Sequence, residues 1–387
     1  MLAQYSFGTV LARHSGLETV AAVLAPLFDQ PHNTVRQRLR EFYLPAGAKA
    51  GATTGLKRRD FHVSDHFADL LRWVMGLCPL QPRQLFLALD VTSLRGRFDV
   101  LCVSVLVCAT AIPVAWKVLP ATHKTSWRPI WQQLLGHLAA AVGPEWSVVV
   151  SADRGLYAPW LFGAITALGW HPLLRVNWSS GGLFKPEGKQ DWQPLSQILT
   201  GVGQSYSGRG VHGKTHSLPC TLLAEWSPGY AEPWVLVTDL APGQVQAHWY
   251  RVRTWIEGGF RDFKSDGWGW QYSRMEDPER AERLWLVLSV ASVLALSVSQ
   301  TESSRPSAAA SPRPPARPGG SRRRVMSCLV SGIVALVCAL ASGRAWEFVK
   351  VLPPSAWPQG GLVAGEPVRK VLDTGPHHRQ DVHNLQP

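Results

Sequence analysis

Two short apolar runs that each end in an aspartate constrain the fold of this chain more than any other feature. They are Gln84–Asp90 (QLFLALD) and Trp146–Asp153 (WSVVVSAD). Runs of this length and composition are typical of buried strands. In open α/β sheets, ligands gather at strand ends, where side chains leave the core. A single aspartate there is often only a turn residue or a helix cap. Two of them on neighbouring strands favour a site that contains Asp90 and Asp153.

The elements around these two runs predict an α/β core. Val100–Cys108 and Ile112–Leu119 are β-rich and close together, which indicates a hairpin beside the first strand. Ser126–Val142 and Ala158–Leu168 predict helices, and Pro172–Val176 predicts a fifth strand. The order β-β-β-α-β-α-β is that of a ribonuclease-H-like core, although many α/β domains come close to it.

The residues before this core predict helices. Leu17–Phe28 carries apolar residues at helical spacing. Asn33 can cap a basic helical run, Thr34–Arg40. Asp65–Cys78 predicts another amphipathic helix.

The pattern changes again after the fifth strand. The segment from about Asn177 to Gly243 is rich in Gly, Ser and Trp and contains short β-like runs, which predicts a β-rich insertion. After it, Trp249–Lys264 and Leu284–Val298 predict helices. A stretch rich in Pro, Ser, Ala and Arg is typical of a basic linker. The expected domains are a helical N-terminal region (1–80), a ribonuclease-H-like core (81–177 and 244–299), the β-rich insertion (178–243), the linker (300–324), and an apolar helix with a disordered tail (325–387).

One apolar segment could be a membrane span. Val325–Gly343 is uncharged, has about the length of a spanning helix, and follows three arginines. It is rich in Ser, Gly, Ala and Cys. That composition favours a buried or interface helix, and we expect no membrane association.

Charge and cysteine usage narrow the class of protein. The formal net charge is +12 and the sequence pI is about 9.7, which favours a polyanionic partner such as nucleic acid, although many basic enzymes have none. None of the six cysteines forms a C-x-x-C pair. They indicate thiols in a reducing compartment, with neither a zinc site nor a disulfide framework.

The predicted helix Trp249–Lys264 carries an unusual polar face. At ~100° per residue, Tyr250, Arg253, Glu257 and Lys264 fall within an arc of about 60°. This face could be a solvated ion-pair face. It also suits phosphodiester chemistry, in which carboxylates hold two divalent ions while Arg, Tyr and Lys grip phosphate oxygens.

At these residues the sequence resembles insertion-sequence family four, a group of bacterial DDE transposases. Tyr250-x-x-Arg253-x-x-x-Glu257-x-x-x-x-x-x-Lys264 matches its Tyr/Arg/Glu/Lys signature without gaps. Asp90-Val91-Thr92 and Asp153-Arg154-Gly155 look like its first and second acid motifs. The resemblance extends from about Asn33 to Val298, and nothing after about Ser299 matches.

The resemblance implies roles for particular residues. The catalytic residues and ligands of two Mg²⁺ ions, for which Mn²⁺ can substitute, would be Asp90, Asp153 and Glu257. The contacts to DNA phosphate would be Tyr250, Arg253 and Lys264. A basic N-terminal helix would bind DNA through Arg36, Arg38 and Arg40. A tryptophan could stack on a flipped base, the candidates being Trp192, Trp226, Trp234 and Trp255.

The resemblance also implies an activity and its setting. The protein would bind the inverted repeats of an insertion sequence as a homodimer, cleave there and join the 3′ ends to target DNA. It would work in the bacterial cytoplasm on nucleoid DNA. Three alternatives stay open: a catalytically silent DNA-binding relic that regulates transposition, a nuclease without strand transfer, and a membrane-anchored basic protein.

Overall fold

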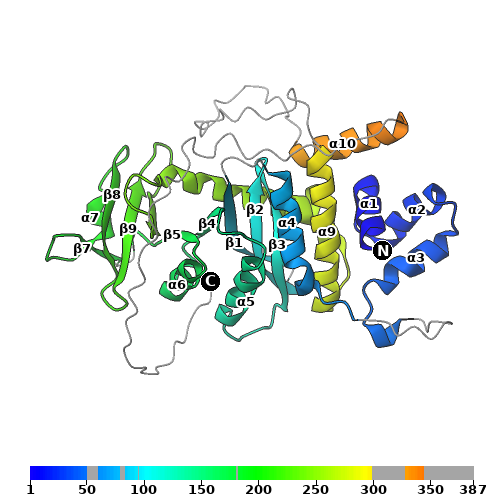
Figure 1. The fold of residues 1–387 in the computed structure, drawn as a ribbon, viewed down its shortest axis with the longest axis horizontal. Coiled ribbons are helices and arrows are strands. Elements are labelled where there is room, and N and C mark those ends of the chain that lie inside the picture. Colours follow the sequence, from blue (N-terminus) through cyan, green and yellow to red (C-terminus); the bar gives the residue numbers. More distant parts are fainter. Residues whose placement is uncertain (50–59, 79–82, 95, 180–181, 299–326, 344–387) are drawn as a thin grey trace.

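A computed structural model describes residues 1–49, 60–78, 83–94, 96–179, 182–298 and 327–343. The described chain is a mixed α/β fold in which a large sheet carries helices on its faces and at one end (Figure 1). This confirms the expected fold class, including helical regions before and after the core. The expected linker at 300–324 and the whole tail after residue 343 lie outside the described residues.

Ten strands form one continuous sheet in the order β3-β2-β1-β4-β5-β10-β9-β8-β6-β7. Along the chain, β1 to β5 and the helices between them follow the expected order β-β-β-α-β-α-β. The bounds of the ten strands are β1 Gln84–Leu94, β2 Phe98–Val107, β3 Thr110–Pro120, β4 Ser147–Ala152, β5 His171–Arg175, β6 Leu183–Pro186, β7 Gln193–Pro194, β8 Ser205–His212, β9 Leu218–Glu225 and β10 Trp234–Thr238.

The β-rich segment after β5 extends the core sheet. Its strand β10 pairs antiparallel with β5, with Leu236 opposite Arg175. Strands β9, β8, β6 and β7 then continue outward from β10. Residues of this segment are therefore held at the edge of β5, close to the end of β4.

Strand β1 is longer than the sequence predicts. It continues beyond Asp90 to Leu94, because β2 pairs with it over its whole second half, up to Leu94 opposite Phe98. The expectation that Asp90 ends its strand is therefore wrong. Its neighbour β4 does end at Ala152, directly before Asp153, so the two acids still lie at one place in the sheet.

Helices cover the sheet and build the end of the molecule next to β3 (Figure 1). α4 and α9 pack against β3, α5 packs against β2 and β3, and α6 packs against β5. The α-helices are α1 Leu2–Ala12, α2 Leu17–Leu27, α3 His32–Glu41, α4 Phe67–Leu77, α5 Arg128–Ala139, α6 Pro159–Ala167, α7 Leu195–Ile198, α8 Trp255–Arg261, α9 Pro278–Val298 and α10 Cys328–Ala341.

The N-terminal helices dock onto α9 through α1. Here Ser6 Oγ donates a hydrogen bond to the carbonyl of Val287 at 3.0 Å. One detail differs from expectation: α3 begins at His32 with Pro31 at its N-cap position, so Asn33 lies inside the helix and does not cap it. A proline can precede a helix without loss because the first amides lack intrahelical acceptors.

The segment expected to be one helix, Trp249–Lys264, changes its winding twice. Residues 247–254 form a 3₁₀ helix, η3 (Ala247–Thr254), α8 follows, and a π-helical turn, η4 (Asp262–Asp266), completes it. Rotation per residue differs among these three windings. The face calculated for a uniform α-helix is therefore not continuous as far as Lys264.

Two apolar helices lie side by side at the C-terminal end of the described chain. α9 is the one helix within the described ranges that is long and apolar enough to cross a membrane, and 78% of its most apolar window is buried in the protein, as in a core helix. α10, in the segment Val325–Gly343, packs on α9. Its 14 residues are fewer than the ~20 that a membrane-spanning helix needs.

Candidate active site

The two aspartates are brought together by the register of two parallel strands. Leu89 of β1 lies opposite Ala152 of β4, so the next residues, Asp90 and Asp153, are neighbours across the sheet. Asp153 also orders the chain that follows β4, because its Oδ1 accepts a hydrogen bond from the Gly155 amide at 3.0 Å. The sequence prediction that these acids meet is therefore correct.

Arg253 joins the two acids. Its Nη2 lies 2.9 Å from Asp90 Oδ2 and 3.4 Å from Asp153 Oδ2. The arginine side chain is 10% exposed. One guanidinium nitrogen thus carries positive charge into the space between both carboxylates.

Burial dominates the electrostatics of Asp90. It raises the pKa of this carboxyl, while the Arg253 guanidinium and the Val91 amide, which donates to Asp90 Oδ1 at 2.8 Å, lower it. The negative charges of Asp153 and Glu257 raise the pKa further. Asp90 therefore depends on nearby positive charge to stay ionised.

Tyr250 lies behind this ion pair. Its ring is buried against Trp234, with centroids 5.9 Å apart, and its hydroxyl donates to the carbonyl of Ala152 at 3.3 Å. Burial raises the pKa of Tyr250 well above its ordinary value, so the phenol stays protonated. It ties the η3 segment to the end of β4.

Gly259 sets the height of the helix that carries Glu257 above strand β3. A Cβ at Gly259 would lie 2.6 Å from the carbonyl oxygen of Ala111 in β3, whereas one at Gly258 would meet its nearest atom at 3.5 Å. Glycine at 259 therefore allows α8 to lie directly on the backbone of β3. Asp262, one turn later, accepts a hydrogen bond from Thr110 Oγ1 at 3.0 Å and holds the same edge.

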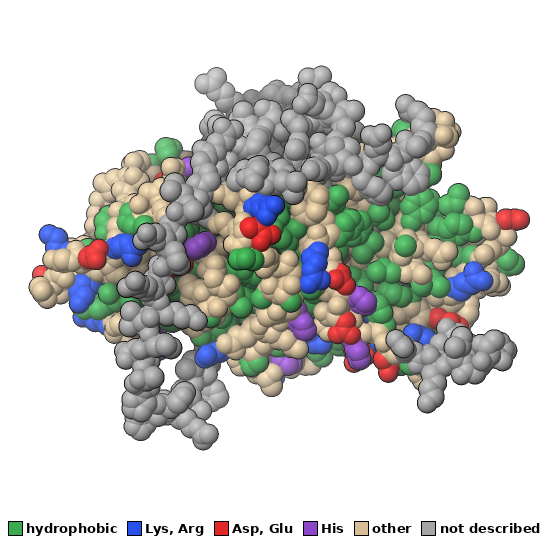
Figure 2. All heavy atoms as spheres, in the orientation of Figure 1, with side chains coloured by type: hydrophobic (Ala, Val, Ile, Leu, Met, Phe, Trp, Pro, Cys, Tyr) green, Lys and Arg blue, Asp and Glu red, His purple; other side chains and the backbone are tan. Residues whose placement is uncertain are grey.

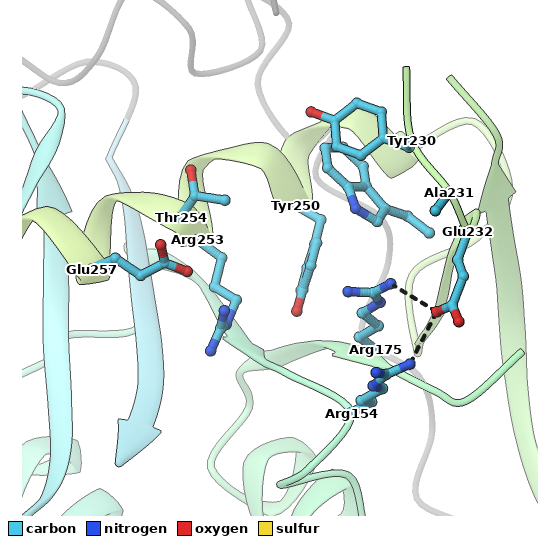
Figure 3. A pocket seen from close by; sticks show the side chains of 10 residues that line it. Arg154, Arg175, Tyr230, Ala231, Glu232, Tyr250, Arg253, Thr254 and Glu257 are labelled. Atoms are coloured by element: carbon cyan, nitrogen blue, oxygen red, sulfur yellow. Dashed lines mark hydrogen bonds and ion pairs between the residues drawn. The ribbon is translucent and has the colours of Figure 1, made fainter. Parts of the chain in front are cut away.

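A cavity of ≈ 440 Å³ opens beside the acids (Figure 3). On one side, Tyr250, Arg253 and Glu257 project from η3 and α8. Its lining combines three aromatic rings, three arginines and two glutamates, and consists of Arg154, Arg175, Tyr230, Ala231, Glu232, Trp234, Tyr250, Arg253, Thr254 and Glu257.

Across the cavity, a carboxylate from the insertion holds two arginines (Figure 3). Glu232 Oε2 lies 3.0 Å from Arg154 Nη1 and 3.9 Å from Arg175 Nη2. Arg154 was part of the second acid motif, whereas Arg175 and Glu232 were not predicted. The only sequence signal for Arg175 was its place at the end of an expected strand.

Other predicted residues lie elsewhere. Lys264 is in η4, outside the cavity lining, and burial lowers its pKa. Of the candidate tryptophans, Trp234 alone is in the cavity lining. Trp226 packs edge-on against Trp178, and Trp192 lies beneath the Lys185 ammonium.

The donors at this site suit a divalent cation. Mg²⁺ and Mn²⁺ bind carboxylate oxygens, and Arg253 shows that positive charge fits between Asp90 and Asp153. Over the ranges that the structure describes, no three His, Cys, Asp or Glu side chains are grouped closely enough to hold a metal. The aspartates therefore fit a metal as a pair, with Glu257 near enough to influence Asp90.

One family model matches more than half of the chain. A family model described as a transposase DDE domain matches residues 86–294. The chain belongs to the transposase DDE domain family. The matched residues include Asp90, Asp153 and Glu257 and the whole Tyr250–Lys264 segment.

No curated protein matches the sequence. Among solved structures, the chain is similar to a piggyBac transposase, determined by cryo-EM as a synaptic complex with hairpin DNA. The identity is 11% and the TM-score 0.33, over 67% of this chain and 52% of that one. The chain therefore spans about half the length of that transposase.

Proposed function

We propose that this DDE domain protein is a cut-and-paste DNA transposase of the insertion-sequence family four type. It binds the ends of its element, cleaves phosphodiester bonds there with divalent metal ions and joins the 3′ ends to target DNA. The observation that carries the proposal is the convergence of Asp90, Asp153 and Arg253, from three distant parts of the chain, beside a cavity lined by Glu257.

The residues divide the chemistry between them. Asp90 and Asp153 would hold divalent metal, which when bound would activate the attacking oxygen and stabilise the leaving one. Glu257 is retained as the third ligand, and the count of two Mg²⁺ ions with it, on the resemblance. Arg253 neutralises the aspartates and can turn a guanidinium nitrogen toward a phosphate oxygen. The Arg154 and Arg175 guanidiniums face the same cavity and suit the DNA backbone.

The structure bears differently on two residues of the signature, Tyr250 and Lys264. Tyr250 lines the cavity, but its hydroxyl is bonded to the Ala152 carbonyl, so its role is to position Arg253 and the strand end. We retain Lys264 as a phosphate contact only on the resemblance. The homodimer and the nucleoid location are proposed on that same resemblance.

A cleavage and joining experiment tests the function. Purified full-length protein is incubated with Mg²⁺ and duplexes taken from the DNA that flanks its gene. Metal-dependent cuts at one end of the element, followed by joining of a pre-cut 3′ end to a second duplex, are the expected result. Cutting without joining would indicate a nuclease, and binding without cutting would indicate a silent regulator of transposition.

A further inference from the structure

The turn between β2 and β3 holds a cysteine in an unfavourable backbone conformation. Val107 pairs with Thr110, so the turn has two central residues, Cys108 at φ 48° and Ala109 at φ 58°. Both φ values are left-handed, as a type I′ hairpin turn requires, and Asn-Gly is the favoured pair there because most side chains are strained. A cysteine at such a position points to a side chain with a role of its own.

A second cysteine, from a segment far along the chain, contacts Cys108. Cys328 is the first residue of α10, and Ser327 caps this helix by accepting a hydrogen bond from the Val330 amide at 3.2 Å. The Cys108 thiol donates a hydrogen bond to the Cys328 sulfur. Both side chains are half-buried. Two sulfur atoms in this contact need only a small approach to form a disulfide bond.

Packing holds the two cysteines in this relation. Leu329 is buried, and a Cβ at Gly267 would lie 2.9 Å from its Cδ2, so the first turn of α10 lies on the segment after η4. On the other side, Thr110, two residues after Cys108, donates to Asp262 of η4. The hairpin turn and α10 therefore both lie against the end of the helical segment that carries the candidate site.

The cysteines differ in reactivity. Burial raises the pKa of Cys78 to about 11 and the pKa values of Cys102 and Cys220 to about 12, so these thiols stay protonated. The hydrogen bond from Cys108 lowers the pKa of Cys328, against the effect of burial. Because the thiolate is the nucleophile in disulfide exchange, Cys328 is the thiol of the pair that reacts first.

We propose that Cys108 and Cys328 form a reversible disulfide bond that fastens α10 to the catalytic core. The Cys328 thiolate attacks one sulfur of a small-molecule disulfide, which forms a mixed disulfide and releases one thiolate. Cys108 then loses its proton to water and attacks the Cys328 sulfur, which forms the internal bond and releases the second thiolate. The protein thiols lose two electrons, and the small disulfide gains them and becomes two thiols.

The bond would change how α10 is held. α10 packs on α9 and α1, and the disulfide adds a covalent link between its first residue and the β2–β3 turn. The loop that it closes contains more than half of the chain, and closing a long loop lowers the entropy of the unfolded chain. The oxidised protein should therefore resist heat better. Transient disulfides of this kind also occur in reducing compartments, where permanent frameworks do not.

The test is incubation of full-length protein with glutathione disulfide. Titratable thiols should fall by two per chain, and mass spectrometry of a non-reduced digest should find the peptide of Cys108 joined to that of Cys328. The thermal unfolding midpoint should rise by about 5 °C and return after dithiothreitol. Cys108→Ser and Cys328→Ser should each abolish the joined peptide and the rise. Cys338→Ser, which replaces an exposed cysteine on the same helix, should behave as the wild type.

Three results would overturn the proposal. They are glutathione retained on Cys328 without an internal bond, a joined peptide that persists in Cys108→Ser, and an unchanged unfolding midpoint in protein that holds the bond. Mg²⁺-dependent cutting of DNA is measured in a separate assay. Failure of the disulfide and failure of the proposed function are therefore told apart.

Discussion

Arg253 Nη2 lies 2.9 Å from Asp90 Oδ2, in an ion pair between residues 163 positions apart in the sequence. The carboxylate is 19% exposed and the guanidinium 10% exposed, so each charge depends on the other. The same nitrogen also reaches Asp153. The ability of Asp90 and Asp153 to bind another cation therefore depends on Arg253.

Removing Arg253 should destabilise the fold as well as impair catalysis. Arg253→Ala leaves Asp90 buried without its counter-charge, which we expect to lower the free energy of unfolding by about 3 kcal/mol at pH 7. Urea unfolding measures this change. Arg261→Ala removes an exposed arginine from the same segment and should have little effect. Equal stability of the two variants would contradict a buried ion pair at Asp90.

Glu232 should act as an internal competitor of DNA phosphate. Glu232→Gln releases Arg154 and Arg175, so we expect DNA binding to become several-fold tighter at low salt. The dependence of log affinity on log salt should steepen by about one. Fluorescence anisotropy over a salt series measures both. Glu187→Gln makes the same charge change at an exposed position of the insertion, and an identical effect there would exclude a specific role for Glu232.

The close approach of α8 to β3 gives a paired glycine test. Gly259→Ala places a methyl group against the Ala111 carbonyl, so α8 must shift, at a cost of about 1–3 kcal/mol. Gly258→Ala meets only an ordinary contact and should be neutral or slightly stabilising. Thermal unfolding compares them, and cleavage should fall only in Gly259→Ala because Glu257 moves with the helix. Indistinguishable variants would refute the packing described.

Asp262 predicts a pH dependence of stability. Burial raises its pKa from 3.8 to about 6, so the fold favours the protonated carboxyl. The protonated Asp262 carboxyl stabilises the fold by at most about 3 kcal/mol. This stabilisation is fully present below pH 3.8 and is lost as the pH rises through about 6. Asp262→Asn should remove this part of the loss between pH 4 and 7, while exposed Asp191→Asn should not. Urea unfolding of the wild type and both variants at pH 4 and pH 7 measures the difference. An equal loss of stability in all three proteins would contradict the raised pKa of Asp262.

The sequence predicted local features well where short segments determine them. The apolar runs before Asp90 and Asp153 predicted the strands and the meeting of the two acids. The full length of β1 was not predictable from its own residues, because it follows from pairing with β2 as far as Leu94. Strand ends depend on partners elsewhere in the chain.

The candidate site was predictable to the extent that one regular helix describes it. Tyr250, Arg253 and Glu257 do share the cavity, but Lys264 does not, because the winding changes after Arg261. The Glu232 contact to Arg154 joins residues 78 positions apart, and no local pattern carries that information. Figure 2 shows Lys and Arg spread over one face of the molecule, so net charge alone did not locate the site.

The central claim is that Asp90, Asp153 and Glu257 act together in metal-dependent DNA cleavage. The most direct measurement is the rate of Mg²⁺-dependent cutting of an end-sequence duplex by Asp90→Asn, Asp153→Asn and Glu257→Gln, with Asp191→Asn as control. We predict a loss of at least about 100-fold in each of the three, with DNA binding and the control unchanged. Wild-type cutting by any of the three variants would contradict the account.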